Sequence, residues 1–355
     1  MSTALLHDWL NQLGGAEDVL TSLNALYPDA PVYTSIYDRQ HMPSQWQTWE
    51  IRSSWMDHLP AVYRHHQPYM PLFALTWATT RIPAEYDLVI SNKSAFCIGA
   101  HCAGRHVCYC LTPTRFIFDF PAYAIREAIP SGATVILRAL NVVLRRWEIN
   151  AARRVTKFIA ISSAVQKRIL DWYGRQSQII YPPVRVEDFS VSHQREDFFL
   201  IVSRLLPYKR IDLAVDAFTQ LGLNLVIAGT GRDHGRLAKR AGSNIKLMGR
   251  VDDATLRDLL GRCQAFVFPG LEDFGIAPMN AMACGKPVIA YAGGGALDTV
   301  RDGITGVLFD SQTPQSLMSA VRRYQGLSFS PDQIRAQAEK FSVARFEKEI
   351  LDAIA

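Results

Sequence analysis

The sequence lacks the patterns that mark membrane-spanning, secreted and zinc-binding proteins. No apolar run approaches the roughly 18 consecutive residues that a membrane-spanning helix requires. The first residues do not resemble a secretion signal, because Asp8 interrupts a short apolar stretch, and we therefore expect a cytoplasmic location. The six cysteines show neither Cys-x-x-Cys spacing nor a nearby Cys/His set, so we expect buried free thiols and no metal site.

The chain contains enough apolar material for two domains. It has 355 residues, of which 48% are hydrophobic and 20% are charged. A chain of this length exceeds the size at which one hydrophobic core usually keeps growing. Two domains of ordinary globular composition are therefore expected.

Charge and tryptophan are concentrated in the first half. Most of the net charge of +5 and all seven tryptophans fall within residues 1–183. This suggests an anionic or amphipathic partner, such as a membrane surface or a lipid-linked phosphate, although core packing and solubility are the simpler explanation for most of these residues. Candidates for a peripheral surface at the inner face of the cell membrane are residues 55–81 and the helix with Arg138, Arg145, Arg146 and Trp147. We expect no nucleic-acid partner.

Short apolar runs alternate with helical patterns, which is typical of parallel sheets covered by helices. In the first part the sequence predicts strands at 4–7, 31–37, 86–91, 106–111, 157–161 and 178–181, with helices that include 16–27, 134–154 and 163–173. The pair Pro182-Pro183 blocks both helix and strand, and so predicts a hinge. A first domain over residues 1–183 follows.

A second series of elements begins directly after the hinge. Strands are predicted at 198–203, 223–229, 245–249, 265–269, 287–291 and 307–309, with helices that begin near Ile211, Arg232, Asp252, Ile276 and Thr313. This gives a second domain over 184–340 and a final helix within 341–355 that we expect to pack back toward the first domain. The predicted fold class is α/β, with two Rossmann-like, doubly wound domains facing a central cleft.

The segment Glu272-Asp-Phe-Gly-Ile-Ala-Pro-Met-Asn280 directly follows the apolar run at 265–269. A strand that turns through Phe274 and Gly275 into a helix exposes free backbone N–H groups, which form a ready anion site. Glu272, ahead of the turn, could accept hydrogen bonds from sugar hydroxyls. Taken alone, the segment fits a helix cap with a surface carboxylate equally well.

Two cations in another loop favour the anion site. Arg204 follows the strand at 198–203, and Lys209 lies in the loop before the next helix. Such a pair can clamp a diphosphate, Arg through its planar fork and Lys as a point charge. Surface cations are common in loops, but their occurrence with Glu272 in one Rossmann-like domain predicts a diphosphate site.

Two glycine pairs give weaker indications. Gly14 and Gly15 link the first predicted strand to the first helix and could bring backbone amides over phosphates or an acceptor. Gly229 and Gly231 follow a predicted strand in the second domain and could face a nucleoside. Both pairs also fit a plain tight turn, because Gly-x-Gly alone is weak evidence.

Over nearly its whole length the sequence resembles glycosyltransferase family 4, and within it the branch of O-antigen and exopolysaccharide mannosyltransferases. The resemblance is carried, in order, by His7-Asp-Trp-Leu with Gly14-Gly15, Tyr86-Asp-Leu-Val-Ile-Ser91, Cys108-Tyr-Cys-Leu-Thr-Pro-Thr-Arg115, Tyr181-Pro-Pro-Val184, Ser203-Arg-Leu-Leu-Pro-Tyr-Lys-Arg-Ile-Asp212, Leu247-Met-Gly-Arg-Val251 and Glu272-Asp-Phe-Gly-Ile276. It implies the GT-B fold, retention at the anomeric carbon and an activated nucleotide-sugar donor.

By position, the resemblance also implies roles for individual residues. Arg204 and Lys209 would hold the donor diphosphate, and Glu272 the hydroxyls of the donor sugar. The remaining donor contacts would come from the backbone amides of Phe274, Gly275 and Ile276 to the phosphates and from Gly249, Arg250 and Val251 to the base. The first-domain wall facing donor and acceptor would be lined by His7, Asp8, Trp9, Gly14, Gly15, Thr112 and Arg115.

The sequence departs from the family pattern at two positions. Asn280 stands where the family usually has a second glutamate, which concerns recognition of the ribose. Leu111 stands where many members have a histidine before Thr-Pro, which removes one potential sugar contact.

The implied function is that of a retaining hexosyltransferase in cell-surface polysaccharide synthesis, with mannose from GDP-mannose as the first choice. A UDP sugar is the alternative donor, and the saccharide acceptor is either free or linked to a polyprenyl diphosphate. In the mechanism we hypothesise, substitution occurs on one face of the sugar and the departing diphosphate takes the acceptor proton. No Asp-x-Asp occurs in the chain, so we expect no metal requirement and no cofactor.

Two other functions remain open. A nicotinamide-dependent oxidoreductase is favoured by Gly229-Thr-Gly231 after a strand and by Asp252 further on. It ranks low because the third glycine, Gly235, comes one place late, and because it leaves the cations and Glu272 unexplained. A catalytically degenerate sugar-nucleotide-binding subunit is favoured by Asn280 alone.

Overall fold

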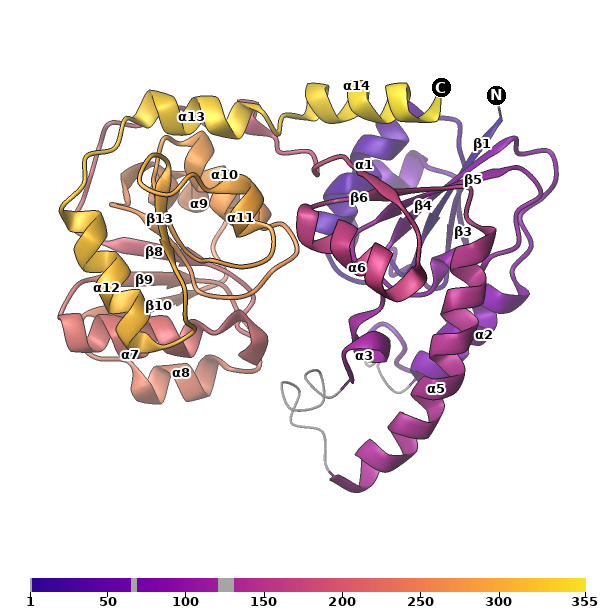
Figure 1. Cartoon of the computed structure of the whole chain (residues 1–355), viewed down its shortest axis with the longest axis horizontal. Helices are drawn as coiled ribbons and strands as arrows, with labels where there is room; N and C mark the ends of the chain where they lie inside the picture. The colour runs from indigo at the N-terminus through magenta and orange to yellow at the C-terminus, as the bar shows by residue number, and fades with distance from the viewer. Residues whose placement is uncertain (1, 65–68, 121–130) are drawn as a thin grey trace. The chain divides into compact units, whose positions relative to one another are not determined.

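The computed structural model describes residues 2–64, 69–120 and 131–355, with residues 131–137 described by their backbone (Figure 1). The chain divides into two compact units. Unit 1 comprises Met1–Pro183 and Phe346–Ala355, and unit 2 comprises Val184–Arg345. The division after Pro183 coincides with the proline pair that the sequence analysis singled out.

Unit 1 contains a parallel sheet of seven strands in the order β3-β2-β1-β4-β5-β6-β7. Its strands are β1 (Thr3–His7), β2 (Val32–Thr34), β3 (Ile51–Ser53), β4 (Leu88–Lys93), β5 (Arg105–Cys110), β6 (Lys157–Ala160) and β7 (Ser177–Ile179). Six of them lie where the sequence predicts a strand. The edge strand β3 was not predicted, because only one of its three residues is apolar and the other two are exposed.

Helices cover both faces of this sheet. They are α1 (Gly15–Leu26), α2 (Met70–Thr79), α3 (Arg115–Phe118), α5 (Ser131–Arg154), α6 (Ser163–Tyr173) and most of α14 (Val343–Ile354), with short 3-10 turns at η1 (Ser44–Thr48), η2 (Trp55–His58) and η4 (Cys97–Gly99). The core on one face joins Ala4 and Leu6 of β1 to Phe73 and Trp77 of α2. Ser162 caps α6, since its side chain accepts a hydrogen bond from the Val165 amide.

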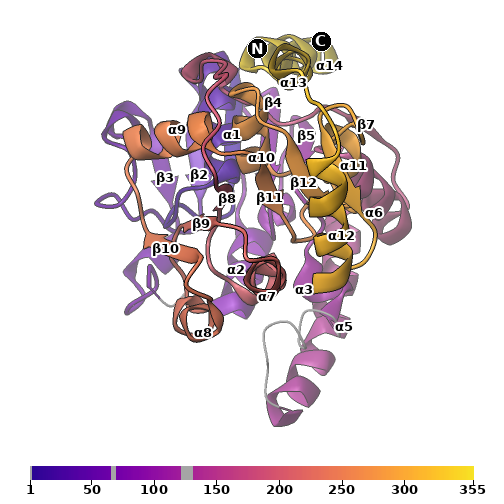
Figure 2. The ribbon, with the colours of Figure 1, turned by 90° about the vertical axis from the view of Figure 1, so that its left-hand side faces the viewer.

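Unit 2 contains a parallel sheet of six strands in the order β10-β9-β8-β11-β12-β13, which Figure 2 shows from β10 to β12. The strands are β8 (Phe199–Val202), β9 (Leu225–Ala228), β10 (Ile245–Gly249), β11 (Phe266–Phe268), β12 (Val288–Tyr291) and β13 (Gly306–Phe309). Each lies within the range predicted for it or extends one residue beyond it.

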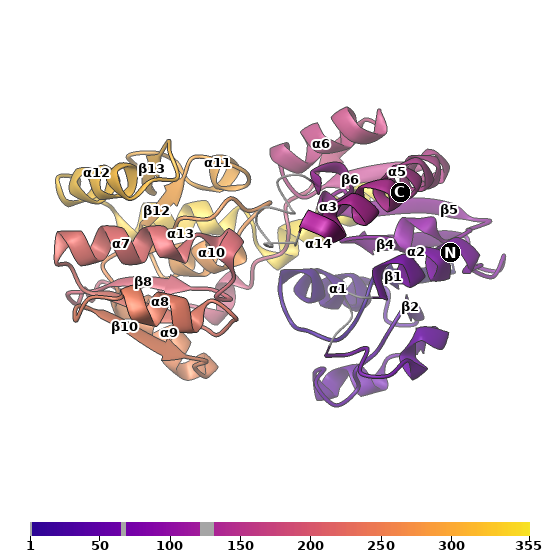
Figure 3. The same ribbon diagram turned by 90° about the horizontal axis from the view of Figure 1, so that it is seen from below.

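The helices of unit 2 also cover both faces of its sheet. They are α7 (Ile211–Leu221), α8 (His234–Arg240), α9 (Asp253–Arg262), α10 (Ile276–Ala283), α11 (Ala296–Thr299), α12 (Pro314–Gln325) and α13 (Pro331–Glu339), with 3-10 turns at η5 (Val186–Asp188) and η6 (Pro207–Lys209). Helices α7 and α12 pack side by side on one face, and α10 and α13 pack together on the other (Figures 1 and 3). Both units are therefore doubly wound α/β sheets, so the predicted fold class is confirmed at the level of the individual domain.

None of the described helices combines the length and the apolar character needed to cross a membrane.

Candidate functional site

The centre of the unit 2 sheet is the point where the strand order reverses. The chain runs from β8 outward through β9 and β10, returns to β11 beside β8, and continues outward through β12 and β13 on the other side. In sheets of this kind, ligands bind outside the carboxyl ends of the strands at the reversal. The loops that leave β8 and β11, at residues 203–210 and 269–275, flank this point.

An ion pair joins these two loops. The Lys209 ammonium contacts the Glu272 carboxylate through Nζ and Oε1, and the two side chains are 14% and 20% exposed. Sixty-three positions separate the two residues in sequence. The structure thus brings together two of the three residues that the sequence assigns to the diphosphate and the sugar of a donor, and keeps both accessible to a ligand.

The backbone around Lys209 and Arg204 is closely fitted. Arg204 is exposed at the start of the loop after β8, and Arg210 at the end of η6 has a left-handed conformation with φ of 52°. A Cβ at Gly270 would lie 2.9 Å from the carbonyl oxygen of Lys209. Glycine at 270 therefore permits the close approach of the two loops, which sets the position of Lys209 relative to Glu272.

Helix α10 begins beside the ion pair. Gly275 precedes it with φ of 97°, a conformation that favours glycine. The side chain of Phe274 is buried and packs against Phe341 with ring centroids 5.7 Å apart, so any contact of residue 274 with a ligand would use its backbone. Asn280 lies half-buried on α10, and its role toward a ribose stays a prediction.

The loop after β12 supports the Glu272 loop, and the sequence analysis did not identify it. The Gly295 amide donates to the Glu272 carbonyl oxygen at 2.9 Å. A Cβ at Gly294 would lie 1.9 Å from the same oxygen, and one at Gly295 would lie 2.3 Å from the Cα of Phe274. The sequence feature that could have identified this loop is the run of glycines after the strand predicted at 287–291.

The glycines after β9 also allow two loops to approach each other closely. A Cβ at Gly229 would lie 1.8 Å from the Ser203 carbonyl oxygen, and one at Gly231 would lie 2.2 Å from that of Leu205. The Gly229 amide also donates to the carbonyl oxygen of Gly249 at 2.7 Å. These glycines hold neighbouring loops together, while an exposed Arg250 and a half-buried Val251 follow at the same sheet edge.

In unit 1, Asp8 has a structural role that corrects its assignment to a ligand-facing wall. Its side chain is fully buried. The carboxylate accepts the backbone amides of Ser94 at 2.7 Å, Ala95 at 2.6 Å, Phe96 at 2.6 Å and Cys97 at 2.8 Å. Asp8 therefore fixes the turn after β4 and presents no surface to an acceptor.

His7 is likewise internal. Its Nδ1 lies 3.2 Å from the side-chain nitrogen Nδ2 of Asn92, and its Nε2 lies 3.3 Å from Glu17 Oε1 in the first turn of α1. The side chain is buried, so the residue ties β1 to β4 and α1. Trp9 is half-buried with its ring edge-on to Phe73, while Leu13 and Gly14 are the exposed residues of this first loop.

A buried ion pair supports the turn that contains Thr112 and Arg115. Lys93 Nζ lies 3.0 Å from Glu148 Oε1 with both side chains fully buried, and it also donates to the Thr112 carbonyl oxygen at 3.2 Å. Burial is the largest single effect on Lys93 and opposes its charge, but the attraction of Glu148, together with smaller contributions from Asp8 and two nearby cysteines, raises the lysine pKa overall. The sequence analysis missed this pair. The sequence feature that could have indicated the pair is a single lysine that follows an apolar strand.

Metal-binding clusters are absent from the described part of the chain: no three His, Cys, Asp or Glu side chains there gather in a way that could hold an ion. All six cysteines are free thiols, and five are buried.

Comparison with known sequences concerns mainly unit 2. Residues 186–341 match the family model described as "Glycosyl transferases group 1", which supports that family for this segment. An uncharacterized glycosyltransferase of Methanocaldococcus jannaschii is 28% identical over 170 residues, which are 46% of this chain and 48% of the relative. A glycogen synthase of Pseudomonas aeruginosa is 30% identical over 182 residues, 49% of this chain and 35% of the relative. The chain thus spans less than half the length of these relatives.

Solved structures resemble the chain over its full length. HepE from Anabaena, in complex with UDP and glucose, has a TM-score of 0.73 at 20% identity, covering 100% of this chain and 99% of that one. Sucrose-phosphate synthase from Thermosynechococcus elongatus has a TM-score of 0.70 at 16% identity, covering 100% and 98%. At these identities the likeness concerns the fold alone, which is that of GT-B glycosyltransferases.

Proposed function

We propose that this protein is a hexosyltransferase whose nucleotide-sugar donor binds at the carboxyl edge of the unit 2 sheet. The observation that carries the proposal is the accessible Lys209–Glu272 pair at the reversal of strand order. A cation and a carboxylate at one sheet edge suit a ligand that combines a diphosphate with sugar hydroxyls. The match of residues 186–341 to group 1 glycosyltransferases supports the same reaction class.

The ion pair can persist when a donor binds. An ammonium group has three N–H donors, so Lys209 can contact a phosphate oxygen and keep Glu272. Glu272 binds Lys209 through Oε1, and its second oxygen can accept a hydrogen bond from a sugar hydroxyl. Arg204 would bind the diphosphate from the start of the same loop.

We propose a substitution on one face of the donor sugar, with retention at the anomeric carbon. The acceptor oxygen forms its bond to the anomeric carbon as the bond to the diphosphate oxygen breaks, and the departing diphosphate takes the acceptor proton. No covalent protein nucleophile is needed. Lys209 and Arg204 would lower the barrier by stabilising the charge that develops on the leaving group.

The donor base is the main question that a binding experiment can decide. GDP-mannose is favoured by the sequence resemblance to mannosyltransferases, and a UDP sugar by the likeness to HepE solved with UDP and glucose. A thermal-shift panel of UDP-glucose, UDP-galactose, GDP-mannose and ADP-glucose tests both, because a ligand of the folded state raises the melting temperature. We expect one base to give a clear shift. No shift with any of the four would contradict the proposal.

Metal independence is a separate prediction. With no Asp-x-Asp in the sequence, turnover should survive EDTA. Complete loss of turnover that added magnesium or manganese restores would overturn this part of the mechanism.

We further propose a saccharide acceptor and a cytoplasmic location, with peripheral attachment to a membrane when the acceptor is lipid-linked. The support is the basic, tryptophan-rich composition of residues 1–183.

A further inference from the structure

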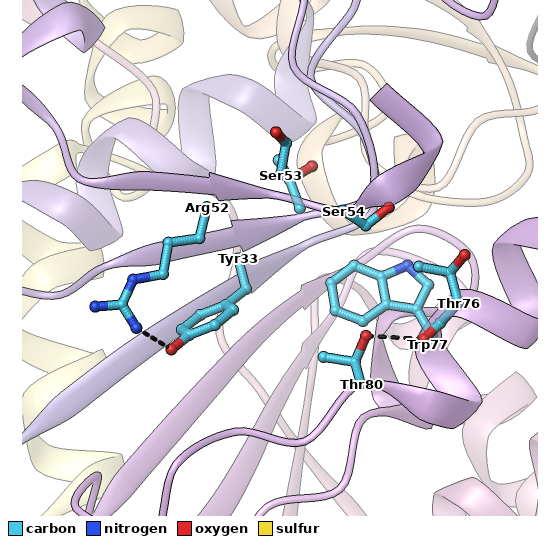
Figure 4. Close-up of a pocket in the computed structure, with 8 residues that line it drawn as sticks. Tyr33, Arg52, Ser53, Ser54, Thr76, Trp77 and Thr80 are labelled. Carbon is cyan, nitrogen blue, oxygen red and sulfur yellow. Dashed lines mark hydrogen bonds between the residues drawn. The ribbon is translucent and has the colours of Figure 1, made fainter. Parts of the chain in front are cut away.

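The turn after β5 carries Thr112 and Arg115, which the sequence resemblance assigns to the acceptor side. Both residues are half-buried, and they lie at the carboxyl edge of the unit 1 sheet, where β5 leads into α3. A pocket of about 170 Å³ between α2, β2 and β3 lies elsewhere in unit 1, and none of the residues assigned to the donor or the acceptor lines it (Figure 4). The placement of the turn, rather than this pocket, therefore bears on acceptor binding.

Two buried charged side chains hold the backbone of this turn. Lys93 Nζ donates to the Thr112 carbonyl oxygen and to Thr114 Oγ1, each at 3.2 Å. The Thr114 amide donates to Glu148 Oε1 at 3.3 Å, and the Thr114 hydroxyl lies 2.8 Å from the same oxygen. Lys93 and Glu148 are themselves paired at 3.0 Å. The pair therefore fixes the backbone on both sides of Pro113.

Stability alone does not explain this ion pair. Both side chains are fully buried, and removing two charges from water is costly. Glu148 Oε1 accepts hydrogen bonds from the Tyr173 hydroxyl and from the turn, whereas Oε2 has no hydrogen-bond partner within the described residues. Apolar side chains of similar volume often stabilise a protein at least as well as a buried ion pair. What the pair supplies, and apolar side chains cannot, is a fixed geometry for the turn.

We propose that Lys93 and Glu148 are positioning residues for the acceptor, because they fix the turn whose Thr112 and Arg115 side chains bind the saccharide. The inference rests on the proposed function, in which a saccharide receives the hexosyl unit. Apolar side chains at positions 93 and 148 can fill the same interior volume, but they offer no partner to the Thr112 carbonyl oxygen or the Thr114 amide. Without these partners the turn loses its fixed geometry, while the surrounding core stays packed.

Steady-state transfer from the donor identified by thermal shift to octyl glucoside, octyl galactoside and octyl mannoside tests the proposal. Lys93→Met leaves the Glu148 charge buried and unpaired, so it should lower the melting temperature clearly. Lys93→Met and Glu148→Leu together remove both charges and should recover most of that loss. The acceptor KM of this double variant should still lie at least about tenfold above that of the wild type, with little change in kcat, because lost acceptor binding raises KM.

Tyr173→Phe is the matched control, because it removes a hydrogen bond to Glu148 Oε1 but no contact with the turn. Its acceptor KM should equal that of the wild type. Calorimetry with UDP and GDP should show the same affinity in every variant, since the proposed donor site lies in unit 2. Failure of the wild type to bind either nucleotide would contradict the donor site, and is thereby distinguishable from failure of this inference.

Four outcomes would overturn the proposal. The first is a wild-type acceptor KM in the double variant. The second is an acceptor KM that follows the melting temperature across the variants, which is the behaviour expected of a merely structural pair. The third is an equal rise in acceptor KM in Tyr173→Phe, and the fourth is the absence of wild-type transfer to all three glycosides.

Discussion

Single residues carry charge in two distinct settings in this protein. The Lys209–Glu272 pair is partly exposed at a sheet edge, whereas the Lys93–Glu148 pair is fully buried. The first pair can exchange contacts with a ligand, while removal of one partner of the second would leave an uncompensated charge in the interior. From their positions in two loops, the sequence analysis assigned Lys209 and Glu272 to one donor site, but it did not predict that they form an ion pair. The second depends on how α5 packs on β4, which no local pattern encodes.

The lowered pKa of the buried His106 side chain predicts that the protein loses stability in acid. Burial lowers its pKa to about 4, Arg154 acts in the same direction, and its Nε2 lies 3.0 Å from Ser91 Oγ. In the unfolded chain the pKa is about 6.5, so between these values only the unfolded state takes up the proton. The free energy of unfolding should therefore fall as the pH drops through this window, by about 3 kcal/mol from this residue.

Urea unfolding at pH 7 and at pH 4.5 measures this effect. His106→Gln keeps a hydrogen-bonding group and cannot titrate, so its stability should fall less between the two pH values. Identical losses in the variant and the wild type would show that His106 does not contribute to acid sensitivity.

The connections of unit 2 depend on glycines at points of close approach. Gly294 has φ of 60°, and a Cβ there would lie 1.9 Å from the Glu272 carbonyl oxygen. Gly222, at the end of α7, has a similar φ of 67° but open space around it. Gly222→Ala should therefore cost only the left-handed strain, about 1–2 kcal/mol. Gly294→Ala must also displace the backbone of Glu272.

We expect Gly294→Ala to weaken binding of the nucleoside diphosphate by at least about tenfold relative to Gly222→Ala, because the loop that positions the Lys209–Glu272 pair has to shift. Calorimetry on both variants provides the comparison. Equal affinities would mean that the loop after β12 does not position the donor site.

Helix α10 carries the departure from the family pattern at Asn280. An amide offers one neutral acceptor where a glutamate offers a charged carboxylate. Hydrogen bonds to charged groups contribute about 1.5–3 kcal/mol, against about 0.5–1.5 kcal/mol for neutral ones. Asn280→Glu should therefore tighten nucleoside diphosphate binding severalfold, with a smaller gain for the 2′-deoxy and 3′-deoxy analogues. Equal or weaker binding in calorimetry would place the ribose contact elsewhere.

Helix α2 is an element that the sequence pattern did not predict. Its segment Met-Pro-Leu-Phe-Ala-Leu-Thr-Trp-Ala-Thr is apolar around most of its circumference, so it has no helical periodicity to detect. Strand β2 ends at Thr34, short of the predicted range, although pairing with the chain after β1 continues through the Ser35 amide, which donates to the Asp8 carbonyl oxygen, and through an isolated parallel bridge between Leu10 and Tyr37. Amphipathic helices such as α7 and α6, by contrast, were predicted at their observed starts.

At the scale of the whole molecule, alternation of strands and helices was sufficient to predict two doubly wound sheets. The reversal of strand order and the approach of the loops after β8 and β11 are properties of the assembled sheet. The final segment belongs to unit 1, where Phe346 packs edge-on against Tyr109 at 5.5 Å and Lys157 Nζ donates to the Ala353 carbonyl oxygen at 2.8 Å.

Helix α5 presents a candidate membrane surface. Val142 and Val143 are 53% and 64% exposed, and Arg138 and Arg146 are exposed on the same helix. Each such cation contributes about 1 kcal/mol near an anionic surface, and salt screens the effect. Replacing both arginines by glutamine should therefore weaken binding to anionic vesicles by about tenfold or more.

Co-sedimentation with anionic and neutral vesicles tests this surface. The matched control replaces Arg257 and Arg322, which are exposed in unit 2, by glutamine, with the same change in net charge. Equal binding of wild type to neutral vesicles, no binding to either kind, or an equal loss in the control would refute a membrane-binding role for α5.

The most direct test of the central claim is release of nucleoside diphosphate from the donor identified by the thermal-shift panel, measured for the purified wild type, Lys209→Ala and Lys246→Ala. Lys246 is an exposed lysine on β10 that controls for loss of one positive charge in unit 2. If Lys209 stabilises the leaving diphosphate, its replacement should reduce turnover by about a hundred- to thousandfold with an unchanged melting temperature, while Lys246→Ala stays at the wild-type rate. Wild-type turnover in Lys209→Ala would contradict the account.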